Sequence, residues 1–263
     1  GRLAEWDGKT WTILEEGPFI EVSGKQNPGP GGRYGNTLFA VGSDRVSVIL
    51  RVLHDGQWTR YRLPRNSHSW DHTWNTEWMR IREAQTERYL MDAFGLFYDL
   101  PGLVYGGKVW GVRPIASHLR ICPDFCSYRG LLVLAGDQTD NAVGQPQSGL
   151  WFGALDSIAK WGKPTGWGGV WRREEVREGS TSDPFLMTGF DKKVVHLTND
   201  GPTTLDLSIE VDFLGDGSWR PYKLMRVPPS GYEHHVFPDA FSAHWVRLRA
   251  GGTGIATVEF VYQ

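Results

Sequence analysis

The sequence predicts an all-β protein, and three observations support this fold class. The 33 Gly and 15 Pro residues are spread along the 263-residue chain, as many tight turns between short strands require. Several segments alternate apolar and polar residues with a period of two, which is typical of half-buried strands. An Asp-Gly turn followed by Trp recurs along the chain, and such a turn reverses one strand into the next.

The N-terminal segment predicts two hairpins. Residues 3–6 and 11–15 are expected to pair as a hairpin, because both alternate as antiparallel strands do and the Asp-Gly turn 7–10 lies between them. The strand expected at 46–53 leads into the second Asp-Gly turn, at 54–58, and then into a partner strand.

A Gly-rich loop, 25–35, separates these hairpins. It is too rich in Gly for a helix, and it lacks the spacing of a phosphate-binding loop. We expect this loop to lie at one end of a sheet, where Arg33 and Tyr34 can reach a functional site.

The middle of the chain continues the strand-and-turn pattern. Residues 89–98 predict two short strands that meet at Gly95, and a helix over 79–91 is the competing interpretation. A further strand is expected at 117–121, and a short helix at 155–161.

The only cysteines, Cys122 and Cys126, are separated by three residues. This is neither a redox CxxC motif nor a sufficient ligand set for a structural zinc ion. We expect two buried thiols, and a local disulfide across the intervening Pro-Asp turn is the alternative.

The composition changes near residue 180. The sequence GSTSDP has the composition of a linker, and it is followed by fewer Trp residues and a cleaner period of two. Six strands at regular spacing predict a β-sandwich over 181–263. They are expected at 193–198, 204–213, 219–226, 234–237, 245–250 and 255–262.

The first 180 residues contain roughly four sets of strands, at about 40 to 50 residues per set, which is the period of a propeller blade. Because blades bury their faces only against neighbouring blades, 1–180 is expected to be the C-terminal part of a larger β-propeller, completed by another segment or chain. A small four-bladed ring is the alternative.

Charge and hydropathy exclude two classes of partner. The formal net charge of −2 and the lack of a basic run argue against nucleic acid, and no apolar stretch approaches 18 residues, so no membrane-spanning helix is expected. The chain begins at Gly1 without an initiator Met or a signal peptide, which indicates a removed leader or a start inside a longer protein. We expect a secreted or periplasmic location.

The segment Asn66–Arg82, NSHSWDHTWNTEWMRIR, is the richest in side chains that transfer protons, bind anions and stack on flat apolar faces. Such large or charged residues are costly to bury without partners, so they predict a polar site lined by aromatic rings. The 13 Trp residues of the chain fit a protein that binds sugars, whose C–H faces pack on indole rings, although Trp also stabilises hairpins.

Four sequences carry a resemblance to known proteins: NSHSWDHTWNTEW, VRPIASHLRICPDFCSYRGLLVLAGD, SGLWFGALDSIAKWG and AHWVRLRA. They resemble bacterial β-propeller proteins associated with glycan degradation, and this likeness covers most of the chain. It implies a propeller fold and a carbohydrate-related role, loosely like propeller glycoside hydrolases and polysaccharide lyases. No catalytic motif of those two groups is matched residue by residue, so the resemblance assigns no catalytic residue.

The window nevertheless supplies candidates for catalysis. A hydrolase needs two carboxylates, or a carboxylate and a His, beside the glycosidic oxygen, and Glu77 and Asp71 are the carboxylates of the window. A lyase needs a neutral His or Tyr as base, and His68 or His72 could serve. The simpler interpretation is that Glu77 forms a salt bridge with an arginine and that the histidines cap turns.

Other residues are candidates for holding the substrate. Aromatic rings stack on sugars, while Arg and Asn bind acidic groups. These candidates are Trp70, Trp74, Asn75, Arg80, Arg82, Arg33, Tyr34 and Arg113.

These observations predict an enzyme that cleaves a glycosidic bond in an acidic polysaccharide or oligosaccharide, as a hydrolase or as a lyase. A non-catalytic glycan-binding propeller and a structural or assembly module are the two alternatives. We expect no cofactor, although the His- and Asp-containing window leaves a structural calcium ion open.

Overall fold

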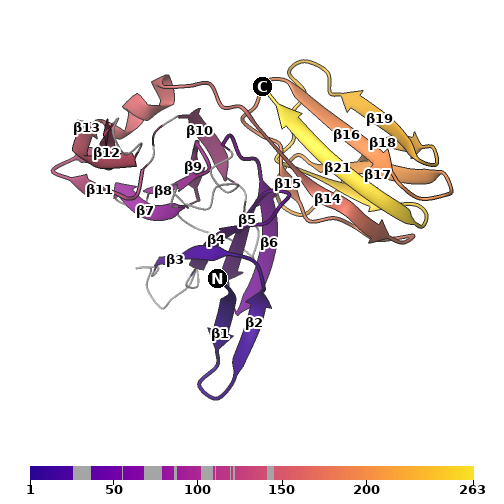
Figure 1. Ribbon diagram of the computed structural model, residues 1–263, viewed down its shortest axis with the longest axis horizontal. Helices are drawn as coiled ribbons and strands as arrows, with labels where there is room; N and C mark the ends of the chain where they lie inside the picture. The colour runs from indigo at the N-terminus through magenta and orange to yellow at the C-terminus, as the bar shows by residue number, and fades with distance from the viewer. Residues whose placement is uncertain are drawn as a thin grey trace.

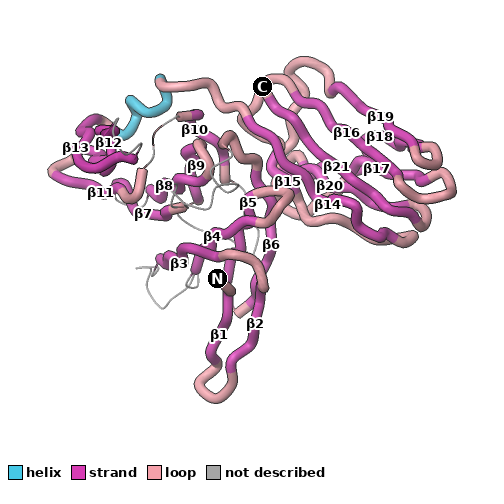
Figure 2. The backbone as a smooth tube through the Cα atoms, in the orientation of Figure 1, coloured by secondary structure: helices cyan, strands magenta, loops and turns pink. Residues whose placement is uncertain are grey.

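The computed structural model describes residues 1–25, 37–54, 56–67, 79–85, 88–101, 109, 111–118, 120, 122–140 and 145–263. These residues form the strands β1 to β21 and a short 3₁₀ helix, η3 (Leu155–Lys160), so the all-β prediction is confirmed (Figures 1 and 2). None of the helices in this part of the chain is long and apolar enough to cross a membrane.

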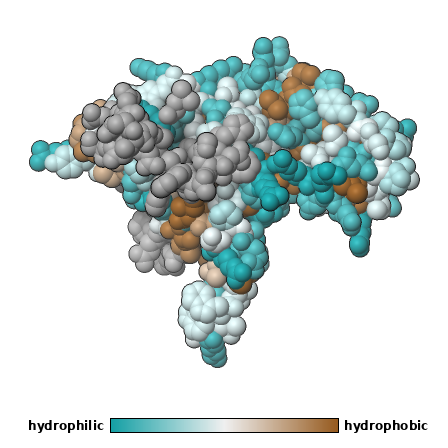
Figure 3. Space-filling model, viewed as in Figure 1, coloured by the Kyte–Doolittle hydropathy of each residue, from teal (hydrophilic) through white to brown (hydrophobic). Residues whose placement is uncertain are grey.

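The chain begins with the hairpin β1 (Leu3–Trp6) and β2 (Trp11–Glu15), as predicted. Its turn is stabilised by Asp7, whose Oδ1 accepts hydrogen bonds from the backbone N–H groups of Lys9 and Thr10, both at 2.7 Å. The Trp6 and Trp11 rings, 5.4 Å apart, flank this turn, and the hairpin projects from the rest of the molecule (Figures 1 and 3).

Three groups of strands follow in chain order, and each is an antiparallel meander. The first contains β3 (Phe19–Lys25), β4 (Thr37–Ser43), β5 (Val48–His54) and β6 (Gln57–Leu63). The second contains β7 (Arg80–Gln85), β8 (Arg88–Ala93), β9 (Leu96–Leu100) and β10 (Arg113–Ser117). The third contains β11 (Phe125–Tyr128), β12 (Leu131–Asp140) and β13 (Gln145–Gly153).

The β8–β9 turn confirms the two strands that were predicted to meet at Gly95. Phe94 and Gly95 both have positive φ, 48° and 77°, which forms the tight reversal. The alternative helix over 79–91 is wrong, because β7 and β8 occupy this segment as an antiparallel pair. The short helix expected at 155–161 is present as η3. A strand was expected at 117–121, but the structure has β10 at Arg113–Ser117 instead. Pairing with β9 sets the position of β10.

The second group of strands packs between the other two. Successive strand residues point to opposite faces, so Met91 and Tyr98 join the core formed with the first group, whereas Leu90 and Phe97 join the core formed with β12. The Tyr98 hydroxyl also donates a 2.6 Å hydrogen bond to the carbonyl oxygen of Pro64, which ties the second group to the first.

The remaining strands form two facing layers. One is the four-stranded sheet of β14 (Gly166–Val176), β21 (Gly254–Tyr262), β16 (Lys193–Asn199) and β19 (Gly231–Val236). The other contains β18 (Arg220–Val227), β17 (Leu205–Asp212), β20 (Trp245–Ala250) and β15 (Phe185–Leu186). Their buried faces contribute to one apolar core.

The second of these layers is continuous with the first group of strands. Phe185 of β15 pairs in parallel with Arg62 of β6, and β15 also pairs with β20, so one eight-stranded sheet extends from β3 to β18. Strand β14 precedes residue 180 yet pairs with β21. The division at residue 180 stays a prediction.

The cysteine prediction was half right. Neither cysteine forms a disulfide, but only Cys122 is buried, whereas Cys126 is exposed. Cys126 lies on β11, where the alternation of the strand turns its side chain away from the core that contains Phe125.

Candidate functional site

The predicted window Asn66–Arg82 is anchored at both flanks by β8. The backbone N–H of Asn66 donates a 2.8 Å hydrogen bond to the carbonyl oxygen of Phe94, directly after β8. At the other flank, Arg80 is the cross-strand partner of Asp92 on β8. The two flanks of the window are therefore held at the same end of one strand.

Most of the predicted site residues lie outside the described part of the chain. This applies to His68, Trp70, Asp71, His72, Trp74, Asn75 and Glu77 of the window, and to Arg33 and Tyr34 of the preceding loop. Their roles remain predictions. Arg80, Arg82 and Arg113 are described.

Arg80 and Arg82 lie on one face of β7 and meet two carboxylates, Glu21 and Asp124. Arg82 donates from Nη1 to Glu21, and from Nη2 to Oδ2 of Asp124 at 3.0 Å. Arg80 lies 3.6 Å from Glu21 and 3.9 Å from Asp124. We call these four residues the arginine–carboxylate cluster, and its formal charges sum to zero.

The electrostatics of the cluster keep Arg82 charged. Partial burial alone would lower the pKa of Arg82, but its hydrogen bonds to Asp124 and Glu21 and their negative charges outweigh that effect, so the pKa is raised. The side chain of Glu21 is 14% exposed and that of Asp124 is 51% exposed. Asp124 is therefore the carboxylate of the cluster with ready access to solvent.

The cluster lies where the edges of three groups of strands meet. Glu21 is on β3, the arginines are on β7, and Asp124 immediately precedes β11. Each of these strands is an edge strand, and β7 contacts both β3 and β11. Three segments that are far apart in the sequence thus contribute to one polar site.

A second polar pair, His118 and Asp92, is buried one strand away from β7. Nε2 of His118 lies 2.9 Å from Oδ1 of Asp92, and the imidazole stacks on the Phe97 ring with centroids 4.5 Å apart. The two side chains therefore satisfy each other by a hydrogen bond within the apolar core. Because Asp92 is opposite Arg80, this pair supports the strand that carries the cluster.

Arg113 is not brought to the cluster. It lies on β10, at the opposite edge of its sheet from β7, and its Nη2 is 3.2 Å from Oδ2 of Asp99. The side chain of Asp99 also lies 3.3 Å from Arg88. In the structure, Arg113 therefore belongs to an exposed ion-pair group on β8, β9 and β10.

Sequence reasoning missed Glu21, Asp124, Asp92 and His118. His118 and Asp124 lie within one of the sequences that carry the resemblance, but no local pattern marks them as site residues, because the partners of all four residues are between 26 and 61 residues away in the chain. Among the described residues, no three His, Cys, Asp or Glu side chains are grouped so that they could hold a metal ion.

No family model matches the chain, and no curated protein matches its sequence. Among solved structures, the chain is similar to a glycoside hydrolase family 43 arabinoxylan arabinofuranohydrolase from Bacillus subtilis, with a TM-score of 0.27 and 8% identity over 92% of this chain and 77% of that chain. It is also similar to an exo-β-1,3-galactanase from Phanerochaete chrysosporium, with a TM-score of 0.27 and 10% identity over 96% of this chain and 72% of that chain.

Proposed function

We propose that this protein is a glycoside hydrolase whose active site contains the arginine–carboxylate cluster. The observation that carries this proposal is Asp124, a half-exposed carboxylate that Arg82 holds beside Glu21 at the meeting point of three groups of strands. Hydrolysis of a glycosidic bond commonly uses two carboxyl groups that flank the bond.

Asp124 is assigned as the general base. It is half-exposed, so water and substrate can reach it, and as an ion-paired carboxylate it accepts protons rather than donating them. Asp124 takes a proton from water as that water attacks the anomeric carbon. A protonated acid then gives its proton to the leaving oxygen as the glycosidic bond breaks, and Glu77, His68 or His72 of the window would supply this proton.

The charge of the cluster favours hydrolysis over elimination. A lyase would use an arginine to bind the carboxylate of the uronic acid, but the positive charge of Arg82 is already matched by Glu21 and Asp124. A uronate at this point would meet two negative groups. We therefore assign the acid-binding role to residues outside the cluster.

The same proposal includes a propeller arrangement for the first three groups of strands. Each group begins with an edge strand, and the edge strands β3, β7 and β11 lie in sequence against one another, as the inner strands of propeller blades do. We propose that the following strands form an accompanying sandwich. A polymeric glycan is met outside the cell, so we also propose a secreted or periplasmic location.

The test is an assay of product chemistry with a matched pair of variants. The wild type is incubated with neutral and uronate-containing oligosaccharides, and new reducing ends and ultraviolet-absorbing unsaturated products are measured. New reducing ends without ultraviolet absorbance are expected. Unsaturated products would show that the protein is a lyase and not a hydrolase. Binding without cleavage would show that it is a non-catalytic glycan-binding module.

Asp124→Asn should lower turnover by about 10²- to 10⁴-fold, because an amide cannot take the proton from water. The amide oxygen can still accept the 2.8 Å hydrogen bond from the backbone N–H of Phe125, so folding should persist. Asp156→Asn is the control, since Asp156 also accepts a 3.0 Å hydrogen bond from an arginine, Arg88. Equal turnover of both variants would overturn the catalytic role of Asp124.

A further inference from the structure

The outer face of the β14–β21–β16–β19 sheet carries three flat rings. On β16, Val195 and Leu197 are buried in the core, so the alternation of the strand turns His196 to the outer face. His196 is the cross-strand partner of His234 on β19, and cross-strand partners share a face. Tyr232, two residues before His234, lies on the same face and is 51% exposed. We call His196, Tyr232 and His234 the ring cluster.

The rings of this cluster are nearly parallel and close together. Nδ1 of His196 lies 2.8 Å from the hydroxyl of Tyr232, so these two rings meet edge to edge, with centroids 6.0 Å apart and planes inclined by 20°. The centroid of the His234 ring is 5.8 Å from that of Tyr232 and 6.4 Å from that of His196, and its plane is inclined to theirs by 15° and 25°. The hydrogen bond and the strand pairing hold the three rings in one group.

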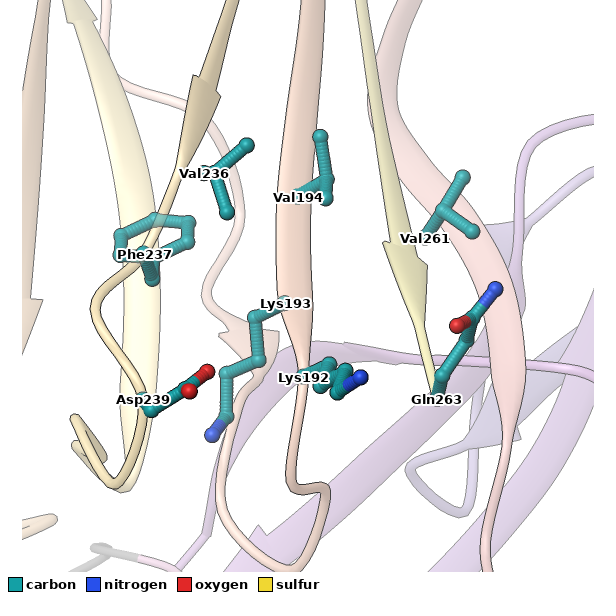
Figure 4. A pocket seen from close by; sticks show the side chains of 8 residues that line it. All are labelled: Lys192, Lys193, Val194, Val236, Phe237, Asp239, Val261 and Gln263. Atoms are coloured by element: carbon teal, nitrogen blue, oxygen red, sulfur yellow. The ribbon is translucent and has the colours of Figure 1, made fainter.

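A recess of about 320 Å³ adjoins the ring cluster on the same two strands. Val194 and Val236 line this recess, and they are cross-strand partners two residues away from the histidines of the ring cluster. Val261 on β21 is opposite Val194 and adds a third apolar side chain (Figure 4). The volume lies within the range of about 300–1,000 Å³ that is usual for small-ligand sites. From Val236 to Tyr232, at about 3.4 Å per residue, the face extends for about 14 Å, which is the length of a short oligosaccharide.

The recess and the ring cluster offer exposed charges of both signs. Lys192 and Asp239 line the recess, and both are exposed (Figure 4). Lys193 also lines it, but this side chain is buried, and its Nζ donates a 2.9 Å hydrogen bond to the carbonyl oxygen of Phe241. Glu259 on β21 is opposite the β16 histidine of the ring cluster, and it is exposed too. Of these three exposed charged side chains, two are therefore negative.

This combination of side chains fits a neutral oligosaccharide. The C–H faces of sugar rings pack on aromatic and aliphatic side chains. A sugar hydroxyl both donates and accepts hydrogen bonds, so it can use the ammonium group of Lys192 and the carboxylate of Asp239 together. An acidic sugar would instead meet the carboxylates of Asp239 and Glu259, which repel it. A peptide that adds a strand is less suited, because such peptides pair with the edge of a sheet and do not lie across its face.

We propose that the outer face of this sheet binds a neutral oligosaccharide, with one sugar ring in the recess beside the valines and the next against the ring cluster. The site is separate from the arginine–carboxylate cluster, and it holds the glycan without acting on any bond. This inference goes beyond the proposed function and does not depend on it, because it requires neither cleavage nor a continuous path to the arginine–carboxylate cluster.

The test measures the binding of linear tetrasaccharides of glucose, xylose and galactose to the whole protein by titration calorimetry, with tetragalacturonate as the acidic comparison. The wild type should bind at least one neutral tetrasaccharide, and it should bind tetragalacturonate more weakly. Tyr232→Ala should weaken the neutral binding by about tenfold, because it removes a half-exposed ring of the cluster. Val236→Glu should weaken it similarly, since it places a charge where a sugar ring packs. Tyr128→Ala is the matched control, because Tyr128 is 53% exposed on β11 in another sheet, and it should bind like the wild type.

The outcomes separate this inference from the proposed function. Weaker binding by Tyr232→Ala and Val236→Glu alone, with unchanged melting temperatures, supports the site even if the wild type never cleaves a glycan. The site is overturned, even if the wild type is a hydrolase, when no neutral tetrasaccharide binds, when these two variants bind like the wild type, or when tetragalacturonate binds more tightly. Equal weakening by Tyr128→Ala also overturns it. A wild-type dimer that Tyr232→Ala converts to a monomer, as measured by light scattering, would overturn it in favour of a second copy on this face. If Tyr232→Ala unfolds, Val236→Glu decides the test, since Val236 is 58% exposed.

Discussion

Replacing Arg62 by Met is expected to lower the free energy of unfolding by about 1.5–3 kcal/mol at neutral pH, because Asp44 and Asp183 lose their hydrogen bonds to a buried cation and keep only the more exposed Arg60 as an ion-pair partner. The Arg62 side chain is 7% exposed. It donates from Nη1 to Asp44 and from Nε to Asp183, both at 2.8 Å. The bond to Asp183 joins β6 to the segment that precedes β15. The substitution therefore weakens the junction between the first group of strands and the C-terminal strands of the eight-stranded sheet.

The same ion pairs should make the free energy of unfolding depend on pH in the acidic range. Desolvation raises the pKa of Asp44, but the positive charge of Arg62 and the backbone N–H groups of Ser47 and Val46 outweigh it, so the folded-state pKa is lowered. A lowered carboxyl pKa stabilises the fold above the unfolded value of about 3.9, and this contribution is lost as the pH falls through the folded-state pKa. The difference between wild type and Arg62→Met should therefore shrink below about pH 3.9.

Chemical denaturation at neutral and acidic pH measures both effects. Arg226→Met is the control, because Arg226 is 75% exposed on β18 and its ion pair with Asp206 is 3.5 Å long. Exposed pairs of this kind contribute about 0–1 kcal/mol. A loss for Arg62→Met no larger than that of the control would show that the buried ion pairs do not stabilise the sheet.

The sequence predicted the strands where alternation and turn chemistry agree. Gly95, with its positive φ, marks the β8–β9 reversal, and the first Asp-Gly turn forms the β1–β2 hairpin. Strand β15 was not predicted from the sequence, because it has only two residues and follows a segment with the composition of a linker. Its pairing with β6 depends on a contact between residues 62 and 185, which no local pattern encodes.

The candidate site was predictable only in part, for the same reason. Arg80 and Arg82 were recognised because they lie in the polar, aromatic-rich window and because arginine binds acidic groups. Glu21 lies in a segment that reads as an ordinary amphipathic strand, and Asp124 reads as a turn residue. Their proximity to Arg82 results from the packing of three groups of strands, so it appears only when the fold is known.

Replacing Trp245 by Ala is expected to lower the free energy of unfolding by about 3–5 kcal/mol, as for other large buried aromatic residues. Trp245 is 2% exposed on β20, and its ring centroid is 4.6 Å from that of Tyr61 on β6. Its Nε1 donates a 3.0 Å hydrogen bond to the carbonyl oxygen of Val109. The substitution removes a contact between early and late strands and leaves that buried carbonyl without its donor.

This variant also tests whether the two ends of the eight-stranded sheet unfold together. Because β15 pairs with both β6 and β20, the loss at Trp245 should shift a single denaturation transition that is seen equally by Trp fluorescence and by circular dichroism. Trp11→Ala is the control, since Trp11 is 67% exposed on the projecting hairpin and its loss should change stability by no more than about 0.5 kcal/mol. Two separate transitions in Trp245→Ala, with only one of them shifted, would contradict this coupling and would show that the early strands are stable without the later ones.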